Sequence, residues 1–343
     1  MNLVIVAWVN GSTVDFERHI PLLWSGVRNR RLGSENRLTV LFLDGLLSLE
    51  EQYRERLKVL GYTLVDGSAN YRHYLDKFPQ LARFGDYEQK CFLRWLVIRD
   101  FFGSDPVIHL DGDLVFNATP EQLARDFGAE TFVLQGCPAF VSTGKSDWLD
   151  SYAGQLKTFA DNIDDYSSVA WLERAGWEQS SREKWSGARF RKIISSDQDF
   201  ISHLLHTDRL PQQRPESVRA VSELVLFENP LYFFEYCSAI LPVGYERIDG
   251  IDYFNGKKIA FWHMQSDFIR YLLVCAKRAD LRIGGRHPNI LNNVTVTSLL
   301  WRCYLRFNSF VLKRIPVYQR YFEHGDFSGI LNDTTFWKND VCR

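Results

Sequence analysis

The first 67 residues alternate between continuous apolar runs and amphipathic segments. Continuous apolar runs are typical of strands buried on both faces, as in parallel sheets, and the segments between them have the pattern of amphipathic helices. The strands are expected at residues 3–9, 38–43 and 62–65, and the helices at 15–30 and 49–60. This alternation predicts an α/β fold built on a doubly wound, mostly parallel sheet.

The alternation continues less regularly through the rest of the chain. Polar and aromatic residues without a clear period indicate a loop at 68–85, and a helix with one apolar face is expected at 86–102. Thr119, Pro120 and Gln122 together form a helix-start signal. Further strands are expected at 107–110, 114–116, 130–136, 222–227, 240–243 and 257–263, and helical segments at 148–192 and from Ser195 onward.

Two carboxylates follow the strand expected at 107–110. Period-2 alternation places Asp111 and Asp113 on the same side of an extended backbone, and Gly112 between them leaves room for a ligand. Carboxylates at the carboxyl end of a strand form an oxygen-rich site for a divalent cation, and open α/β sheets bind their ligands at that edge. Asp-Gly is also a common turn dipeptide, so the residues alone leave open both a solvated turn and a metal site.

Three other groups are candidates for chemistry, and each also has an ordinary structural explanation. Lys90 and Arg94 lie one turn apart on a predicted helix, where they form either a phosphate-facing pair or a solvated basic edge. The acidic residues of Asp197-Gln-Asp199 either belong to a site or cap the helix that starts there. His263 ends the last predicted strand, and it is either a metal ligand or a packed core residue.

The composition describes a globular chain and excludes several classes of protein. With 343 residues, 45% of them hydrophobic, the chain can form one large domain with additions and is not disordered. A net charge of −1 gives no reason to expect nucleic-acid binding. Six scattered cysteines without a C-x-x-C pair fit reduced thiols. No signal peptide is recognisable, and no apolar run reaches about 18 residues. We therefore expect a soluble, cytoplasmic protein.

The C-terminal part of the chain differs in character. Residues 281–322 contain no Asp or Glu but seven Lys or Arg. On a helical projection Arg302, Arg306 and Lys313 share one stripe, and aromatic residues cover much of the remaining surface. This pattern fits a helix on an anionic membrane surface, and it equally fits a terminal helix that docks its apolar face on its own domain. The membrane alternative places a peripheral contact at residues 296–320, on the inner face of the membrane.

Together these motifs resemble a GT-A glycosyltransferase, and in particular the retaining family that includes bacterial lipooligosaccharide galactosyltransferases and glycogenin. The resemblance implies a GT-A (Rossmann-like) nucleotide-sugar-binding domain at residues 1–270, with a mixed, mostly parallel sheet. Residues 145–192 would form a helical cap near the acceptor site, and 271–343 a basic, aromatic helical extension. The matching features are the strand Val4–Ala7, Arg94, Leu110-Asp-Gly-Asp113 as the D-x-D motif, Phe140-Val-Ser-Thr-Gly144, Asp197-Gln-Asp199 as the D-Q-D motif, and the late His263.

The resemblance implies metal-dependent transfer of a sugar, from a nucleotide-sugar such as a UDP-sugar to a glycan or lipid-linked acceptor, with retention. It implies Asp111, Asp113 and His263 as the metal ligands, and an imidazole among carboxylates favours Mn²⁺ over Mg²⁺. In the family the first acid of the D-Q-D motif orients donor hydroxyl groups. The implied catalytic residues are Asp197, Gln198 and Asp199, and the implied donor-binding residues are Ala7, Trp8, Lys90, Arg94, Asp111, Gly112, Ser142 and Gly144.

Two departures from the family pattern concern donor binding. Val141 stands where the family has an asparagine, and no Gly-x-x-Lys-Pro segment follows His263. The lysine that helps to hold the diphosphate in relatives is therefore unassigned in this chain.

Three alternative functions use the same residues. An inverting GT-A transferase would need a carboxylate base near the acceptor, for which Asp197, Asp199 and Asp267 are candidates. A haloacid-dehalogenase-like phosphatase would use Asp111 and Asp113, although its motif normally lies near the start of the domain. A nucleotide- or carbohydrate-binding module would keep the fold without turnover.

Overall fold

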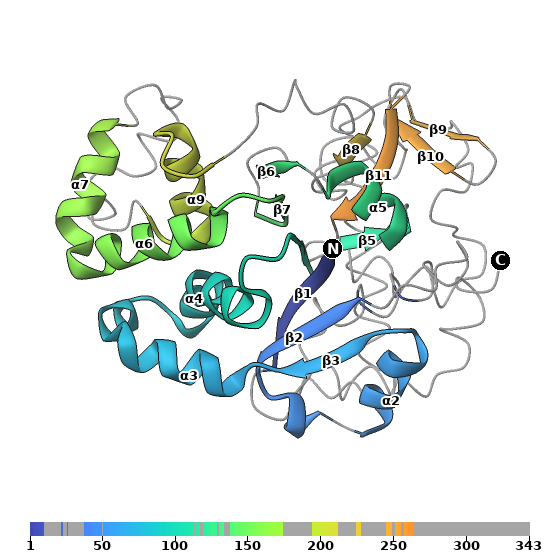
Figure 1. Ribbon diagram of the computed structural model, residues 1–343, viewed down its shortest axis with the longest axis horizontal. Coiled ribbons are helices and arrows are strands. Elements are labelled where there is room, and N and C mark those ends of the chain that lie inside the picture. Colours follow the sequence, from blue (N-terminus) through green and yellow to red (C-terminus); the bar gives the residue numbers. More distant parts are fainter. Residues whose placement is uncertain are drawn as a thin grey trace, which may run out of the picture.

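A six-stranded sheet forms the centre of the computed structural model (Figure 1). In spatial order its strands are β3 (Thr63–Asp66), β2 (Thr39–Asp44), β1 (Asn2–Trp8), β4 (Val107–Asp111), β7 (Phe140–Thr143) and β6 (Thr131–Val133). The first four are parallel to one another, whereas β7 is antiparallel to both of its neighbours. The predicted α/β class with a mixed, mostly parallel sheet is therefore confirmed.

The structure describes residues 1–9, 22, 26, 38–49, 51–112, 114–116, 119–128, 130–133, 138–173, 194–211, 224–227, 245–248, 251–254 and 257–263. Beyond residue 211 this description covers only the backbone of four strands. Several predicted segments lie outside the described residues: nearly all of the helix at 15–30, the strand at 240–243, the second half of the helical stretch at 148–192, and the extension at 271–343.

The parallel strands are buried and end at one edge of the sheet. Nearly all residues of β1 and most of those of β2 are inaccessible to solvent, which explains their continuous apolar sequences. The register pairs Val6 with Asp111, and Trp8 with Asp44 at the end of β2. Asp111 therefore lies at the carboxyl edge of the parallel strands, where open α/β sheets bind their ligands.

A second sheet begins at Leu114, and all of its strands but the first lie at the upper right of Figure 1. Its strands are β5 (Leu114–Phe116), β11 (Lys257–His263), β10 (Ile251–Phe254) and β9 (Tyr245–Ile248), with β8 (Leu224–Phe227) beside β11. Strands β5 and β11 are antiparallel, and their register pairs Leu114 with His263. The last described strand thus returns to the residue that follows Asp113 in the sequence.

Helices cover the left side of the sheet in Figure 1. They are α3 (Ser68–Lys77), α4 (Asp86–Phe102), α6 (Trp148–Asp161), α7 (Ile163–Glu173) and α9 (Asp197–His206), while α2 (Glu51–Val59) and α5 (Pro120–Phe127) lie elsewhere. Helix α4 has the predicted bounds, and its side chains from 90 to 98 are all buried, because it packs against β2, α3, α6 and α9. The Tyr152 hydroxyl donates a hydrogen bond to the Phe92 carbonyl oxygen at 3.0 Å and so fixes α6 to α4. None of the described helices is long and apolar enough to cross a membrane.

The prediction of a loop at 68–85 was wrong. This segment forms α3 and the short 3₁₀ helix η2 (Pro79–Arg83). Tyr71, Tyr74 and Phe78 are buried in the same hydrophobic cluster as α4. Their spacing of three and four residues is the period of one helix face, which the many polar residues around them obscure in the sequence.

Candidate functional site

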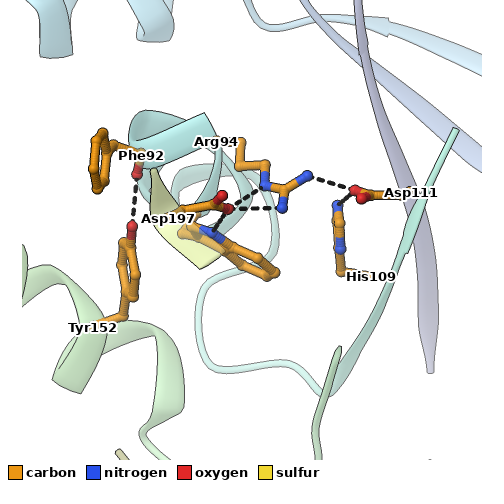
Figure 2. Close-up of polar contacts among 7 residues, drawn as sticks. Phe92, Arg94, His109, Asp111, Tyr152 and Asp197 are labelled. Carbon is orange, nitrogen blue, oxygen red and sulfur yellow. Dashed lines mark hydrogen bonds and ion pairs between the residues drawn. The ribbon is translucent and has the colours of Figure 1, made fainter. Parts of the chain in front are cut away.

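Arg94 joins two carboxylates that are far apart in the sequence (Figure 2). Its Nη1 atom donates a hydrogen bond to Oδ1 of Asp111 at 2.5 Å. Its Nε atom donates to Oδ2 of Asp197 at 2.9 Å, and its Nη2 atom lies 2.7 Å from the same oxygen. The structure thus brings together three residues that separate motifs had singled out.

Two hydrogen bonds and an ion pair converge on one oxygen of Asp197. Besides the two groups of Arg94, the indole Nε1 of Trp95 donates a hydrogen bond to Oδ2 at 3.0 Å. Asp197 is 3% exposed and Arg94 is 4% exposed. A buried charge needs such partners, because an unpaired charge in the protein interior is very costly. Adjacent residues of α4 therefore hold the first turn of α9 in place.

Asp111 is the member of this cluster that solvent can reach. Its side chain is 27% exposed, compared with 5% for Arg94. Gly112 follows in a turn and is also partly exposed. With both carboxylates ionised, the cluster of Arg94, Asp111 and Asp197 carries an excess of negative charge. The accessible side of the cluster is thus a carboxylate that can bind a cation or a hydroxyl group.

His109 lies beside Asp111 on the same face of β4 and is 1% exposed (Figure 2). Its ring centroid is 4.6 Å from that of Trp95. Its Nε2 atom is 3.8 Å from Oδ1 of Asp111, which is too far for a hydrogen bond. The backbone carbonyl of Pro138 acts on the ring as a hydrogen-bond acceptor, although neither ring nitrogen forms a hydrogen bond of ordinary geometry within the described part of the chain.

Burial controls the ionisation of the cluster. It lowers the pKa of His109 to about 3, with the Arg94 charge acting in the same direction, so the imidazole is neutral at pH 7. Burial also raises the pKa of Asp197, against the opposing effect of Arg94. For Arg94, burial acts to lower the pKa, but the charges of Asp111 and Asp197 outweigh it and raise the pKa well above its ordinary value. Arg94 therefore stays charged at every pH at which the protein is folded.

The other predicted metal ligands are described in part. Asp113 lies outside the described residues, and of His263 only the backbone is described. That backbone pairs with Leu114, so the register brings His263 to the residue next to Asp113 in the chain. Among the side chains that the structure describes, no group of three or more His, Cys, Asp or Glu is arranged to hold a metal ion.

Ala7 and Trp8 lie at the end of β1, at the same sheet edge as the end of β4. Both are buried, and the Trp8 ring makes an edge-to-face contact with Tyr87, with ring centroids 5.6 Å apart. Lys90 is buried as well, and its Nζ atom donates a hydrogen bond to Oδ2 of Asp86 at 2.5 Å. Lys90 is thus paired within its own helix, whereas Arg94 one turn later reaches the sheet.

Ser142 and Gly144 lie away from Asp111. Because β7 runs antiparallel to β4, Ser142 pairs with Ile108, and Gly144 lies farther toward the amino end of β4. The Ser142 hydroxyl is buried and donates a hydrogen bond to the Phe127 carbonyl oxygen at 2.9 Å. The structure does not bring these two predicted donor-binding residues to the carboxyl edge.

The remaining residues of the D-Q-D motif differ from each other. Gln198 is exposed on the first turn of α9. Asp199 Oδ2 accepts hydrogen bonds from the backbone N–H and the hydroxyl group of Ser195, at 3.0 and 2.7 Å. Asp199 therefore closes the first turn of the helix, and Gln198 is available for contact with a ligand.

Trp95 and His109 belong to the cluster but were not predicted from the sequence. The alternation that places Asp113 with Asp111 also places His109 on that side of β4, so a signal for it was present. For Trp95 the sequence contained only its position next to Arg94 on a helix. Its hydrogen bond to Asp197 joins residues 102 positions apart and depends on how α4 and α9 pack.

No protein-family model matches this chain, and no curated protein matches it. Among solved structures, the chain is similar to the apo form of mouse xyloside xylosyltransferase 1, with 15% sequence identity and a TM-score of 0.27. The match covers 40% of this chain and 49% of that protein, so the chain spans about half the length of the protein it matches. This is a distant likeness to a glycosyltransferase, and the proposals below rest on the residues of the site.

We predict that Arg94→Met lowers the free energy of unfolding by about 3–5 kcal/mol, because it leaves Asp197 buried without its cation. The double variant Arg94→Met, Asp197→Asn should lose less than the sum of the two single changes. Urea denaturation of the three variants and the unchanged protein gives the four free energies of unfolding that this double-mutant cycle needs. Strictly additive effects would contradict the described pairing.

Arg99→Met is the matched control on the same helix. Arg99 pairs with Asp150 at 3.4 Å, and their side chains are 30% and 74% exposed. An exposed ion pair of this kind contributes about 0–1 kcal/mol, so this variant should stay close to the unchanged protein.

We predict that His109 makes the metal-free protein less stable in acid. Between its unfolded pKa of about 6.5 and its folded pKa of about 3, the unfolded chain binds a proton that the folded chain does not. This contribution to stability is complete above about pH 6.5 and falls by up to about 1.4 kcal/mol per pH unit as the pH drops. Urea denaturation at pH 7, 6 and 5 in a chelator should give a steeper fall for the unchanged protein than for His109→Phe. Parallel profiles would contradict the burial of a neutral imidazole.

Proposed function

We propose that this chain is a metal-dependent GT-A glycosyltransferase that moves a sugar from a nucleotide-sugar, a UDP-sugar, to a glycan or lipid-linked acceptor with retention. The observation that carries the proposal is the convergence of Arg94, Asp111 and Asp197. Arg94 lies 17 residues before Asp111 and 103 residues before Asp197. The D-x-D and D-Q-D motifs could each occur by chance, but chance does not explain why a buried guanidinium joins them at the ligand-binding edge.

The donor is proposed to bind at the carboxyl edge of β1 and β4. The ends of these two strands lie side by side there, with Trp8 on one and Asp111 on the other. The half-exposed ring of Tyr87 stands against Trp8, and aromatic faces of this kind stack well on flat bases. The partly exposed Gly112 borders the same edge and leaves the backbone open to a diphosphate.

This edge is proposed to bind a divalent cation. Asp111 offers an accessible carboxylate, and the β5–β11 register brings His263 to the residue that follows Asp113. Two carboxylates and an imidazole form a donor set that suits Mn²⁺, with Mg²⁺ as the all-oxygen alternative. When bound, the cation would act as a Lewis acid that neutralises charge on the departing diphosphate.

Arg94 and Asp197 are proposed to position the reacting sugar. Arg94 fixes the Asp111 carboxylate through Nη1 and fixes Asp197 through Nε and Nη2. Since Asp197 Oδ2 already accepts hydrogen bonds from Arg94 Nε and Trp95 Nε1 and pairs with Arg94 Nη2, its orientation is set before the donor arrives. A carboxylate held in this way can orient a donor hydroxyl group and stabilise positive charge that develops on the sugar ring. Gln198, exposed on the next position of α9, is proposed to face the reacting carbon.

We predict that UDP together with Mn²⁺ raises the melting temperature of the protein. A ligand that binds only the folded state at 100 times its dissociation constant stabilises it by about 2.7 kcal/mol. Differential scanning fluorimetry would measure the shift, and adding a chelator should abolish it. If no nucleoside diphosphate shifts the melting temperature in the presence of either cation, the proposed donor site is wrong.

We predict that Asp113→Asn abolishes release of UDP from UDP-sugars without unfolding the protein. The change removes a charged oxygen ligand of the proposed cation but keeps the size of the side chain. Released nucleotide would be measured across a set of UDP-sugars, and the anomeric configuration of the product would be read by NMR.

Asp105→Asn is the control for this experiment. Asp105 is exposed and lies just before β4, at the opposite end from Asp111, so this variant should release UDP at the unchanged rate. Equal activity of Asp113→Asn and the control would exclude the role of the D-x-D motif.

A further inference from the structure

Lys90 is a charged residue at the carboxyl edge to which the proposed reaction gives no role. It lies on α4 between two residues that contact the ends of strands. Three residues earlier, Tyr87 packs against Trp8 at the end of β1. Four residues later, Arg94 donates a hydrogen bond to Asp111 at the end of β4. Helix positions three and four apart share a face, so Lys90 lies on the face of α4 that borders the proposed donor site.

The ammonium group of Lys90 is buried, but its pairing is incomplete. Its Nζ atom donates a hydrogen bond to Oδ2 of Asp86 at 2.5 Å. The Lys90 side chain is 3% exposed, whereas that of Asp86 is 68% exposed and so is mostly solvated. An ammonium group has three N–H donors, and the residues that the structure describes accept only this one hydrogen bond from it. Lysine is rarely so buried without close pairing, so the two remaining donors indicate a further anionic partner.

The charge balance of the proposed donor site calls for such a group. Arg94 is already engaged with Asp111 and Asp197 through Nη1, Nε and Nη2. The diphosphate of a nucleotide-sugar would bring more negative charge to an edge where Asp111 is the accessible carboxylate. The proposed cation would offset only part of this charge. A lysine ammonium acts as a compact positive charge with rotatable donors, which suits phosphate oxygens.

We infer that the Lys90 ammonium binds a phosphate oxygen of the donor, and that Asp86 occupies this position while the site is empty. This inference rests on the proposed function, because it assumes that a nucleotide-sugar binds at the carboxyl edge. A diphosphate oxygen takes the place of Asp86 Oδ2, and Asp86 turns to water at little cost because it is already exposed. Asp86 is thus an internal competitor of the donor, which keeps the buried ammonium paired between turnovers.

The test removes each partner of the pair alone and then both together. Isothermal titration calorimetry of UDP into the full chain, in the presence of Mn²⁺, measures the dissociation constant. We expect Lys90→Met to bind UDP about 10- to 100-fold more weakly, because it loses a hydrogen bond between charged groups. We expect Asp86→Asn to bind UDP about two- to fivefold more tightly, because the competing carboxylate is gone.

The double variant separates competition from a general effect of charge. Asp86 competes only for the Lys90 ammonium, so Asp86→Asn should give little or no gain in the Lys90→Met background. An equal gain in both backgrounds would show that Asp86 acts by repulsion at a distance and overturn the inference. Glu55→Gln on α2 is the matched control, since Glu55 pairs with Lys58 at 2.7 Å and both side chains are more than half exposed. This control should leave the affinity for UDP unchanged.

Thermal unfolding without nucleotide separates a binding role from a structural one. Methionine keeps the length and the apolar stem of lysine, so Lys90→Met should be as stable as the unchanged protein while its affinity for UDP falls. If Lys90→Met does not fold, Lys90→Gln replaces it, because it keeps a polar group without the charge. The same loss of affinity for UDP is expected.

The result also distinguishes this inference from the proposed function. If the unchanged protein binds UDP and the Lys90 variant binds it equally well, only the role of Lys90 is overturned. If the unchanged protein binds no nucleoside diphosphate, with either Mn²⁺ or Mg²⁺, the proposed donor site is refuted and this inference with it.

Discussion

The candidate site depends on one buried guanidinium between two carboxylates. Arg94 contacts Asp111 at the end of β4 and Asp197 at the start of α9, and both Arg94 and Asp197 are almost inaccessible to solvent. Neither the Asp197 carboxylate nor the Arg94 guanidinium could be buried alone, because the free-energy cost of removing a charge from water is compensated only by a partner of opposite charge. The same contacts tie the carboxyl edge of the sheet to the helical layer, so the site and the fold share one set of interactions.

Trp95 links this polar cluster to the hydrophobic core. Its indole N–H group holds Asp197, and its ring lies 4.9 Å from the guanidinium carbon of Arg94. The ring also packs against Trp148 and His109, at 5.0 and 4.6 Å between ring centroids, and against Tyr152 at 6.0 Å. A polar network backed by such a layer is rigid, and in its low-dielectric surroundings each hydrogen bond is stronger than it would be in water. A site built in this way can present Asp111 to a ligand without rearranging.

Sequence reasoning predicted the elements of the fold better than their directions. The apolar runs at 3–9 and 38–43 and the helix at 86–102 were found with nearly correct bounds, because their periods are local properties. The helical face of Tyr71, Tyr74 and Phe78 was taken for a loop, since polar neighbours masked its spacing. Ser142 and Gly144 were assigned to the donor site from a motif, but the antiparallel direction of β7 carries them to the other end of β4. Strand direction depends on long-range pairing, which no local pattern reports.

The sequence by itself determined the alternation of strands and helices and placed Asp111 at the end of a buried strand. It also singled out Arg94 and Asp197 as candidates, because residue type and spacing along the chain are sufficient for each of these inferences. Only the tertiary structure decided that Arg94 and not Lys90 reaches the sheet, since Lys90 pairs with Asp86 on its own helix. It likewise decided that Trp95 and His109 belong to the site. Burial, ion pairing and pKa depend on which distant segments pack together, and a single sequence does not contain those distances.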